Sequence, residues 1–354
     1  VNFIEYPKNT IWVISNRLQL LKIQLNNQLQ VIDRELISLS DNSSGFSEQN
    51  FKKIAIAIDK EQHIWVAGNG TLLSYDTKTG EKRNLNSANR KEIAIQQAQQ
   101  LMIDNTNILW LGTLNHGLYK MDLENNSFLN SNEFSNTSEK QFPFFYEYPI
   151  LTMCENSKGD IWLGSQGKGG LALLKGKEIE RYLLNMSNKV LDYNYLTKTN
   201  KQFDDEDFFE IKRLMNDRED NIWVGSKTGL SKISFKNNSE IFEIQKFNTF
   251  KDKQGELIKS PVFAIEEDRM GNIWVGYWKK GIAKLTFDKQ SETYTSVNYQ
   301  NQSNDTNSLS NNFVRDILED SSGDIWVGTS SGLNKLKQDA AGNITFTSYL
   351  NEPE

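Results

Sequence analysis

One short motif recurs seven times along this chain. Each copy is a tryptophan between two aliphatic residues, and successive copies stand 45 to 61 residues apart. The seven residues are Trp12, Trp65, Trp110, Trp162, Trp223, Trp274 and Trp326. A repeat of this length, built from short apolar runs, indicates an array of similar units in place of a single layered domain.

The last repeat shows the expected secondary structure of one unit. Residues 314–319 alternate apolar and polar, a turn rich in Asp, Ser and Gly follows, and residues 325–328 form an apolar run around Trp326. A second turn leads into residues 333–336, and a more polar run covers residues 344–347. Alternation interrupted by turn residues predicts antiparallel strands. Four strands in about 50 residues are typical of a propeller blade. We therefore predict an all-β, seven-bladed β-propeller of four-stranded antiparallel blades.

The repeat spacing also predicts the blade boundaries. A single propeller covers residues 1–354, with blades at approximately 1–46, 47–92, 93–143, 144–203, 204–255, 256–307 and 308–354. Val1 precedes Trp12 by nearly the same distance as Val314 precedes Trp326. The first blade should therefore begin with an inner strand and the last should end with an outer one, without strand exchange between them.

We interpret the seven tryptophans as core residues between neighbouring blades. Burying one removes roughly 150–250 Å² from water, a gross gain on the order of 4–6 kcal/mol. A glycine two residues later, as at Gly276, should allow a bulge or a close strand approach. The acidic turns before the tryptophans have oxygen ligands at a spacing that suits Ca²⁺. The simpler interpretation is a turn in which Asp bonds to its own backbone, so no metal site is predicted.

Composition argues against several classes of function. A net charge of −6 disfavours non-specific nucleic-acid binding, and no apolar run is long enough to insert into a membrane. One cysteine, Cys154, excludes an internal disulfide. Only His63 and His116 could act as histidine bases, and no arrangement typical of a catalytic triad or a phosphate-binding loop is present. We predict no enzyme activity and no cofactor.

The last blade resembles the two-component regulator propeller repeat. The similarity lies in residues 305–312, in residues 318–329 around Trp326, and in Gly332-Leu333. That repeat builds the periplasmic sensor of hybrid two-component systems in Bacteroidetes. The resemblance implies one propeller of a longer protein, located in the periplasm or at the cell surface. Its implied partners are an adjoining propeller or β-sandwich domain of the same protein, and a homodimer is a further option.

The turns between the second and third strands of each blade differ most among the repeats. They carry five Lys or Arg residues, one His and no acid, and blade 6 places Trp278 there. Aromatic rings beside charged and amide groups suit sugars, whose C–H faces stack and whose hydroxyls need hydrogen-bond partners. The candidate ligand-binding residues are Arg17, His116, Lys168, Tyr193, Tyr195, Lys227, Tyr277, Trp278, Lys279 and Lys280.

These observations predict a non-catalytic, extracytoplasmic sensor propeller. Its expected ligand is an oligosaccharide, an acidic one being favoured by the basic turns, and its signal would pass to a membrane-linked kinase. Two alternatives are open. One is a cell-surface or secretion-associated propeller that binds protein. The other is a propeller lyase, which would need a His/Glu active site with a metal.

Overall fold

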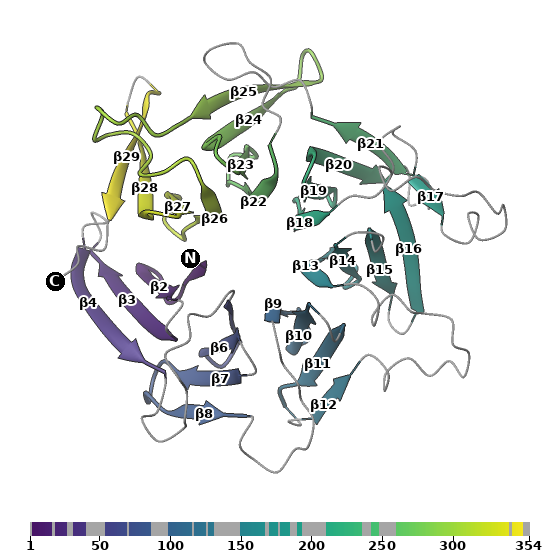
Figure 1. Ribbon diagram of the computed structural model, residues 1–354, viewed down its shortest axis with the longest axis vertical. Coiled ribbons are helices and arrows are strands. Elements are labelled where there is room, and N and C mark those ends of the chain that lie inside the picture. Colours follow the sequence, from purple (N-terminus) through teal and green to yellow (C-terminus); the bar gives the residue numbers. More distant parts are fainter. Residues whose placement is uncertain are drawn as a thin grey trace. The chain divides into compact units, whose positions relative to one another are not determined.

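The described residues form β-sheets throughout. The computed structural model describes residues 2–15, 18–26, 31–39, 54–68, 71–85, 98–114, 117–124, 127–130, 149–166, 170–175, 178–184, 190–192, 210–235, 242–247, 260–339 and 342–349. Within these ranges the chain forms seven antiparallel sheets and no helix (Figure 1). None of these residues lies in a helix that could span a membrane. The prediction of a seven-bladed, all-β propeller is confirmed.

The chain divides into two compact units, which are described separately. Unit 1 comprises Val1–Val13, Ile23–Arg34 and Asp217–Glu354, and unit 2 comprises Ile14–Lys22 and Glu35–Asn216. Blade 1 contributes residues to both units. Its strands are, in sheet order, β1 (Asn2–Glu5), β2 (Thr10–Ile14), β3 (Gln19–Leu25) and β4 (Val31–Ser38).

Unit 2 contains blades 2 to 4. Blade 2 is β5 (Ala55–Ile58), β6 (His63–Gly68), β7 (Thr71–Asp76) and β8 (Lys82–Asn84). Blade 3 is β9 (Ala98–Ile103), β10 (Ile108–Thr113), β11 (Leu118–Asp122) and β12 (Ser127–Asn130). Blade 4 is β13 (Ile150–Glu155), β14 (Ile161–Ser165), β15 (Leu171–Lys175), β16 (Glu178–Leu184) and β17 (Val190–Asp192). The strands of each blade follow one another in sheet order, which is the meander that the repeat predicts.

Blade 4 corrects the expectation of four strands in every blade. The fifth strand, β17, pairs antiparallel with β16, with Leu184 opposite Val190. The sequence pattern assigns this segment to a long loop between blades. A strand of three residues is too short to show an alternating pattern, so pairing with the edge of an existing sheet is what defines it.

Unit 1 contains most of blade 5 and all of blades 6 and 7. Blade 5 is β18 (Ile211–Asn216), which belongs to unit 2, followed by β19 (Ile222–Ser226), β20 (Gly229–Phe235) and β21 (Phe242–Lys246). Blade 6 is β22 (Val262–Glu267), β23 (Ile273–Tyr277), β24 (Ile282–Asp288) and β25 (Thr293–Tyr299). Blade 7 is β26 (Val314–Glu319), β27 (Ile325–Thr329), β28 (Gly332–Gln338) and β29 (Ile344–Tyr349). Blade 7 thus takes its four strands from one continuous stretch of chain.

The seven repeat tryptophans are core residues, with 0 to 6% of their surface exposed. Trp274 of blade 6 packs in one cluster with Val314 and Ile317, which belong to the first strand of blade 7. Trp110 of blade 3 packs in the same way with Ile150 and Met153 of blade 4. Each of these two indoles therefore joins its own blade to the first strand of the next blade, as predicted.

The glycine two residues after the tryptophan permits this close packing in blades 5 and 6. A Cβ atom added at Gly276 would lie 2.5 Å from Val314 Cγ1, and one added at Gly225 would lie 2.6 Å from Val262 Cγ1. These partners are the first residues of the next blade's inner strand. The inner strand is also bulged at this level in blade 6, where the register shifts between Val262 and Ala264. Both expected roles of the glycine, close approach and a neighbouring bulge, are present.

Candidate ligand-binding site

The acidic turns between first and second strands serve the fold of blades 2, 3, 5, 6 and 7. In blade 6 the Oδ1 atom of Asp268 accepts hydrogen bonds from the backbone N–H groups of Met270 and Asn272, each at 2.9 Å. Its Oδ2 atom accepts a 2.8 Å bond from Trp274 Nε1. The same Asp–Trp bond, across six residues, occurs in blades 2, 3, 5 and 7. The turn interpretation therefore accounts for these carboxylates, since their oxygens are used by turn and indole donors.

In three blades of unit 1, the acidic residue that ends the first strand connects that blade to the preceding or neighbouring one. Glu267 ends β22, and its Oε2 atom accepts a 2.8 Å bond from the backbone N–H of Arg218 in blade 5. Glu319 ends β26, and its Oε2 atom accepts a 2.9 Å bond from the backbone N–H of Arg269 in blade 6. Glu5 ends β1 and accepts bonds from Ser321 of blade 7. These acids stabilise the contact between neighbouring blades within unit 1.

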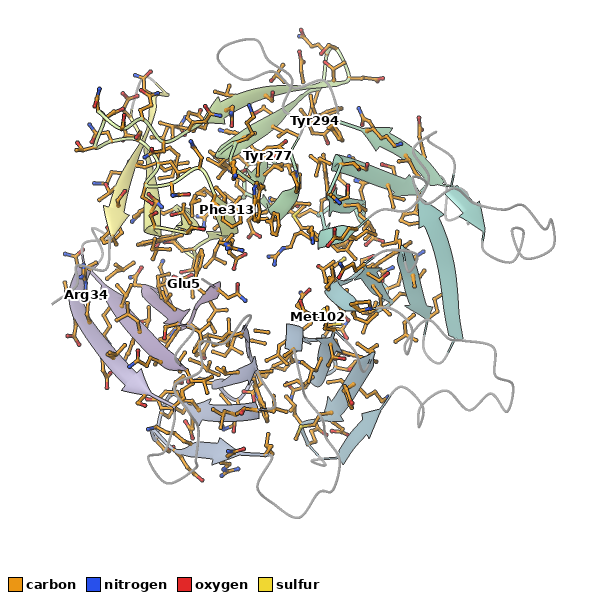
Figure 2. All side chains as sticks on the ribbon, in the orientation of Figure 1. Glu5, Arg34, Met102, Tyr277, Tyr294 and Phe313 are labelled. Carbon is orange, nitrogen blue, oxygen red and sulfur yellow. The ribbon has the colours of Figure 1, made fainter. Side chains whose placement is uncertain are left out.

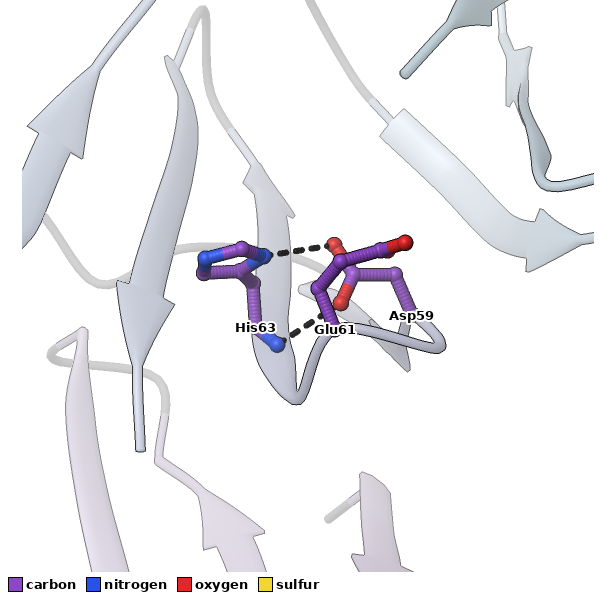
Figure 3. A group of neighbouring side chains, drawn as sticks. All are labelled: Asp59, Glu61 and His63. Carbon is purple, nitrogen blue, oxygen red and sulfur yellow. Dashed lines mark hydrogen bonds and ion pairs between the residues drawn. The ribbon is translucent and has the colours of Figure 1, made fainter. Parts of the chain in front are cut away.

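His63 belongs to the corresponding turn of blade 2, beside Asp59 and Glu61 (Figure 3). One ligand atom from each of the three lies within 4.8 Å of the others, as a metal site requires. Asp59 Oδ2, however, already accepts from His63 Nδ1 at 2.9 Å and from Trp65 Nε1 at 2.7 Å. His63 thus takes the position of Asn272 in blade 6, where the amide bonds the turn Asp. The turn of blade 2 therefore accounts for the proximity of these three side chains.

The tip of blade 6 carries an exposed aromatic ring. Trp278 follows β23 directly and is 38% exposed, whereas the seven repeat tryptophans are buried. Its ring meets Phe313 of the next blade edge-on, with centroids 4.0 Å apart, and lies 5.4 Å from Phe263. One part of the indole is thereby fixed against two phenyl rings and another faces solvent.

The turn that carries Trp278 has an unusual backbone. Lys279 adopts a φ of 61°, in the left-handed region that residues other than glycine rarely occupy, and Gly281 follows with a φ of 73°. The backbone N–H of Trp278 donates to Pro261 O at 2.9 Å, and that of Gly281 donates to Asn312 O at 2.9 Å. Strained residues held by surrounding bonds occur often at functional sites.

The connection from blade 6 to blade 7 supports this tip. Within residues 300–313, Asn301 Nδ2 donates to Leu309 O at 2.6 Å, and its backbone N–H donates to Asn312 Oδ1 at 2.7 Å. Asn311 Oδ1 accepts the backbone N–H of Phe313 at 2.8 Å. Phe313 and Tyr277 are labelled on neighbouring blades in Figure 2. These bonds hold Phe313 in place and so fix the aromatic surface beside Trp278.

The guanidinium group of Arg315 also contacts this aromatic surface. Arg315 lies in β26 where the register shifts between Val314 and Asp316, so it is the extra residue of a bulge. Its Cζ atom stands 3.9 Å from the centroid of the Phe313 ring. We call Phe263, Trp278, Phe313 and Arg315 the blade 6–7 tip cluster. Sequence reasoning identified only Trp278 of these four, because the others lie in ordinary strand or loop patterns and meet only through the packing of two blades.

The structure places some predicted site residues and not others. Lys279 is exposed and Lys280 half-buried beside Trp278, and Lys227 is exposed at the corresponding turn of blade 5. Tyr277 is buried, with 1% of its surface exposed. It is the last residue of β23 and pairs with Val262, and both faces of this strand are covered, so its ring cannot reach a ligand at the tip. Burial also raises the pKa of its hydroxyl. The remaining candidates lie outside the described residues: Arg17, His116, Lys168, Tyr193 and Tyr195.

Comparison with known proteins supports the recognition made from the last blade. Residues 308–331 match the family described as "Two component regulator propeller". A relative from Formosa agariphila, named histidine kinase P4, is 26% identical over 222 residues, which are 62% of this chain and 14% of that protein. The recognition of this repeat is therefore confirmed, and the chain corresponds to a small part of the kinase's length.

Two solved structures are also similar. The extracellular domain of a hybrid two component system from B. thetaiotaomicron is 19% identical and aligns over 96% of this chain and 40% of that one, with a TM-score of 0.43. PorZ, a surface component of the type-IX secretion system of Porphyromonas gingivalis, is 14% identical and aligns over 98% of this chain and 46% of that one, with a TM-score of 0.60. The likeness to PorZ shows a shared fold.

Proposed function

We propose that this chain is the sensor propeller of a hybrid two-component system and that it lies outside the cytoplasm. The match of residues 308–331 to the two-component regulator repeat and the similarity to a histidine kinase support this assignment. The propeller itself supplies recognition and no chemistry. Its partners are an adjoining propeller or β-sandwich domain of the same protein, and its output is a membrane-linked kinase.

The ligand that best suits the tip of blade 6 is an oligosaccharide. The observation that carries this proposal is Trp278, an indole that is 38% exposed and held against Phe313. A rigid aromatic ring can stack on the C–H face of a sugar at little cost in conformational entropy. Lys279 and Lys280 follow directly and offer donors to the sugar hydroxyls.

Signalling then requires the ligand to bind one arrangement of the propeller and its neighbouring domain better than another. A ligand shifts such an equilibrium only by the difference between its affinities for the two states. A ligand at the blade 6–7 tip, between the end of one blade and the start of the next, can contact a neighbouring domain as well. Oligosaccharide binding at this tip would thus change the position of the neighbouring domain relative to the propeller.

Calorimetric titration of the protein with a panel of neutral and acidic oligosaccharides tests this proposal. Trp278→Ala should weaken the binding of any hit by about tenfold or more, equivalent to about 1.4 kcal/mol. The matched control is Phe287→Ala, which removes a 43% exposed ring from the opposite end of the same blade. A panel without a single hit, or a hit that binds Trp278→Ala as tightly as the unmodified protein, would argue against the proposal.

A further inference from the structure

Arg315 is an exposed cation in the first strand of blade 7. Within the described part of the chain no carboxylate pairs with it, and its contact with the Phe313 ring is made to a neutral group. Other cations of unit 1 differ: Arg269 Nε lies 2.9 Å from Glu319 Oε1, and Lys335 Nζ lies 3.3 Å from Asp324 Oδ2. Arg315 thus lacks the carboxylate partner that Arg269 and Lys335 have.

The Arg315 side chain is exposed, although neighbouring groups cover part of its guanidinium. Burial by neighbouring groups lowers the pKa of the Arg315 guanidinium, which nevertheless stays protonated at physiological pH. Because the guanidinium is exposed and protonated, it is accessible to an anionic ligand from solvent. Asp316, the next residue, is buried, and its Oδ1 atom accepts the backbone N–H of Ile317. A bound anion would supply the counter-ion that the described residues do not provide.

The position of Arg315 connects it with the ligand surface. Its guanidinium and the indole of Trp278 contact the same ring, that of Phe313, at 3.9 and 4.0 Å. The exposed Lys279 adds positive charge at this tip. Asp305 is the nearest acid in the connecting loop by sequence, and its Oδ1 atom already accepts the backbone N–H of Asn307 at 2.9 Å.

We infer that Arg315 is a specificity-determining residue that binds an anionic group, a carboxylate or a sulfate ester, of the sugar that contacts Trp278. This inference rests on the proposed function and specifies the ligand as an acidic oligosaccharide. The planar guanidinium offers parallel N–H donors, which match two oxygens of a carboxylate or sulfate. A sugar ring on the indole and its acidic substituent on Arg315 can be bound together because both groups adjoin Phe313.

Matched ligand pairs test the assignment. An oligogalacturonate is compared with its methyl ester, and a sulfated oligosaccharide with its desulfated form, at about 20 mM ionic strength. We expect the anionic member of one pair to bind about tenfold tighter. The pair that shows the preference identifies the group as carboxylate or sulfate. Arg315→Gln should remove that preference and leave the neutral member's affinity unchanged.

The control variant is Lys289→Gln. This residue is exposed in the turn between β24 and β25, at the opposite end of blade 6, and its substitution makes the same change in net charge. It should leave both affinities unchanged. If neutral sugars bind at Trp278 without any preference for the anionic members, the inference about Arg315 is overturned while the proposed function stands. If Arg315→Gln lowers the affinities for the anionic and the neutral ligand equally, Arg315 has a structural role, and the inference is overturned as well.

A second measurement needs no sugar. Trp278 is the exposed tryptophan, so collisional quenching of fluorescence, corrected with Trp278→Phe, reports on its surroundings. Uncompensated positive charge should make iodide a better quencher than caesium at low salt, with acrylamide as the neutral reference. We expect Arg315→Gln, but not Lys289→Gln, to reduce the iodide-to-acrylamide ratio by about twofold. Equal quenching by iodide and caesium, unchanged in Arg315→Gln, would refute the inference whatever the ligand is.

Discussion

Trp223 Nε1 donates a 2.8 Å hydrogen bond to Oδ2 of Asp217, six residues earlier in the chain. Lys232, opposite Trp223 on the next strand, places its Nζ atom 5.5 Å from the indole centroid and 3.9 Å from the same carboxylate oxygen. Similar Asp–Trp–Lys groups occur in blades 3, 6 and 7. The recurring tryptophan is thus fixed by a turn acid and covered by a lysine, in addition to packing.

Removing the turn acid should destabilise the protein strongly. Asp217→Ala would leave the indole N–H of Trp223 and the backbone N–H of Asn221 buried without their acceptor. We expect a loss of about 2–4 kcal/mol, seen as a lower urea midpoint. The control Asp288→Ala removes an exposed turn acid that bonds only backbone and surface groups, and it should cost under about 1 kcal/mol. Similar losses in the two variants would show that the indole bond contributes little.

The two classes of tryptophan should respond differently to truncation. Trp223 is fully buried and stacks on Phe247 at 5.1 Å, so Trp223→Ala should cost about 3–5 kcal/mol. Trp278 is partly exposed and keeps only its ring contacts with Phe313 and Phe263, so Trp278→Ala should cost about 1–2 kcal/mol. Denaturant melts followed by circular dichroism measure both. A larger loss for Trp278→Ala would mean that the tip cluster is part of the core.

Gly276 should not tolerate a side chain. Its added Cβ would meet Val314 Cγ1 at 2.5 Å, and we expect Gly276→Ala to cost about 1–3 kcal/mol. Val314→Ala removes the clashing atom. A double-mutant cycle should therefore show that the double variant is more stable than the sum of the two single losses predicts. Strict additivity would indicate that Gly276 is needed for its backbone and not for the close approach of Val314.

The link between blades 5 and 6 should depend on pH. Burial raises the pKa of the Glu267 carboxyl above its usual value of 4.5, and the N–H of Arg218 opposes this effect only in part. The folded protein therefore holds this proton more tightly than the unfolded chain. The resulting contribution to stability is present below pH 4.5 and is lost as pH rises through the folded pKa.

Glu267→Gln keeps an acceptor for the Arg218 N–H and cannot ionise. As pH rises from 4 to 7, Glu267→Gln should become progressively more stable relative to the unmodified protein. Glu81 provides the opposite case, because its bond to Arg83 lowers the pKa of its carboxyl. Glu81→Gln should lose stability relative to the unmodified protein as pH rises from the folded pKa of Glu81 to about 4.5, and the difference should stay constant above that pH. Parallel pH curves of the melting temperature for the unmodified protein and Glu267→Gln would contradict this prediction.

The architecture could be predicted from the sequence because each blade is a local structure. The four strands of a blade are consecutive, so each strand pairs with one that lies within about 40 residues of it in the chain. Alternating residues and turn residues mark these strands, and the spacing of residues such as Trp274 and Trp326 marks where each blade repeats. Gly276 could be assigned to close packing for the same reason, since it stands at a constant distance from the tryptophan. The acidic turns were interpreted correctly as turns, but their bond to the indole was not foreseen.

Only the tertiary structure decided which groups of one blade meet the next. The contact of Trp278 with Phe313, the bond from Arg218 to Glu267 and the contact of Arg315 with Phe313 join residues of different blades. A periodic pattern indicates which face of a strand is buried, and it does not indicate which side chain lies opposite across a blade interface. Tyr277 shows the same limit, because a strand covered on both faces buries even the residue that an alternating pattern would expose. The fold follows from short-range patterning, whereas the blade 6–7 tip cluster depends on how two separately patterned blades pack together.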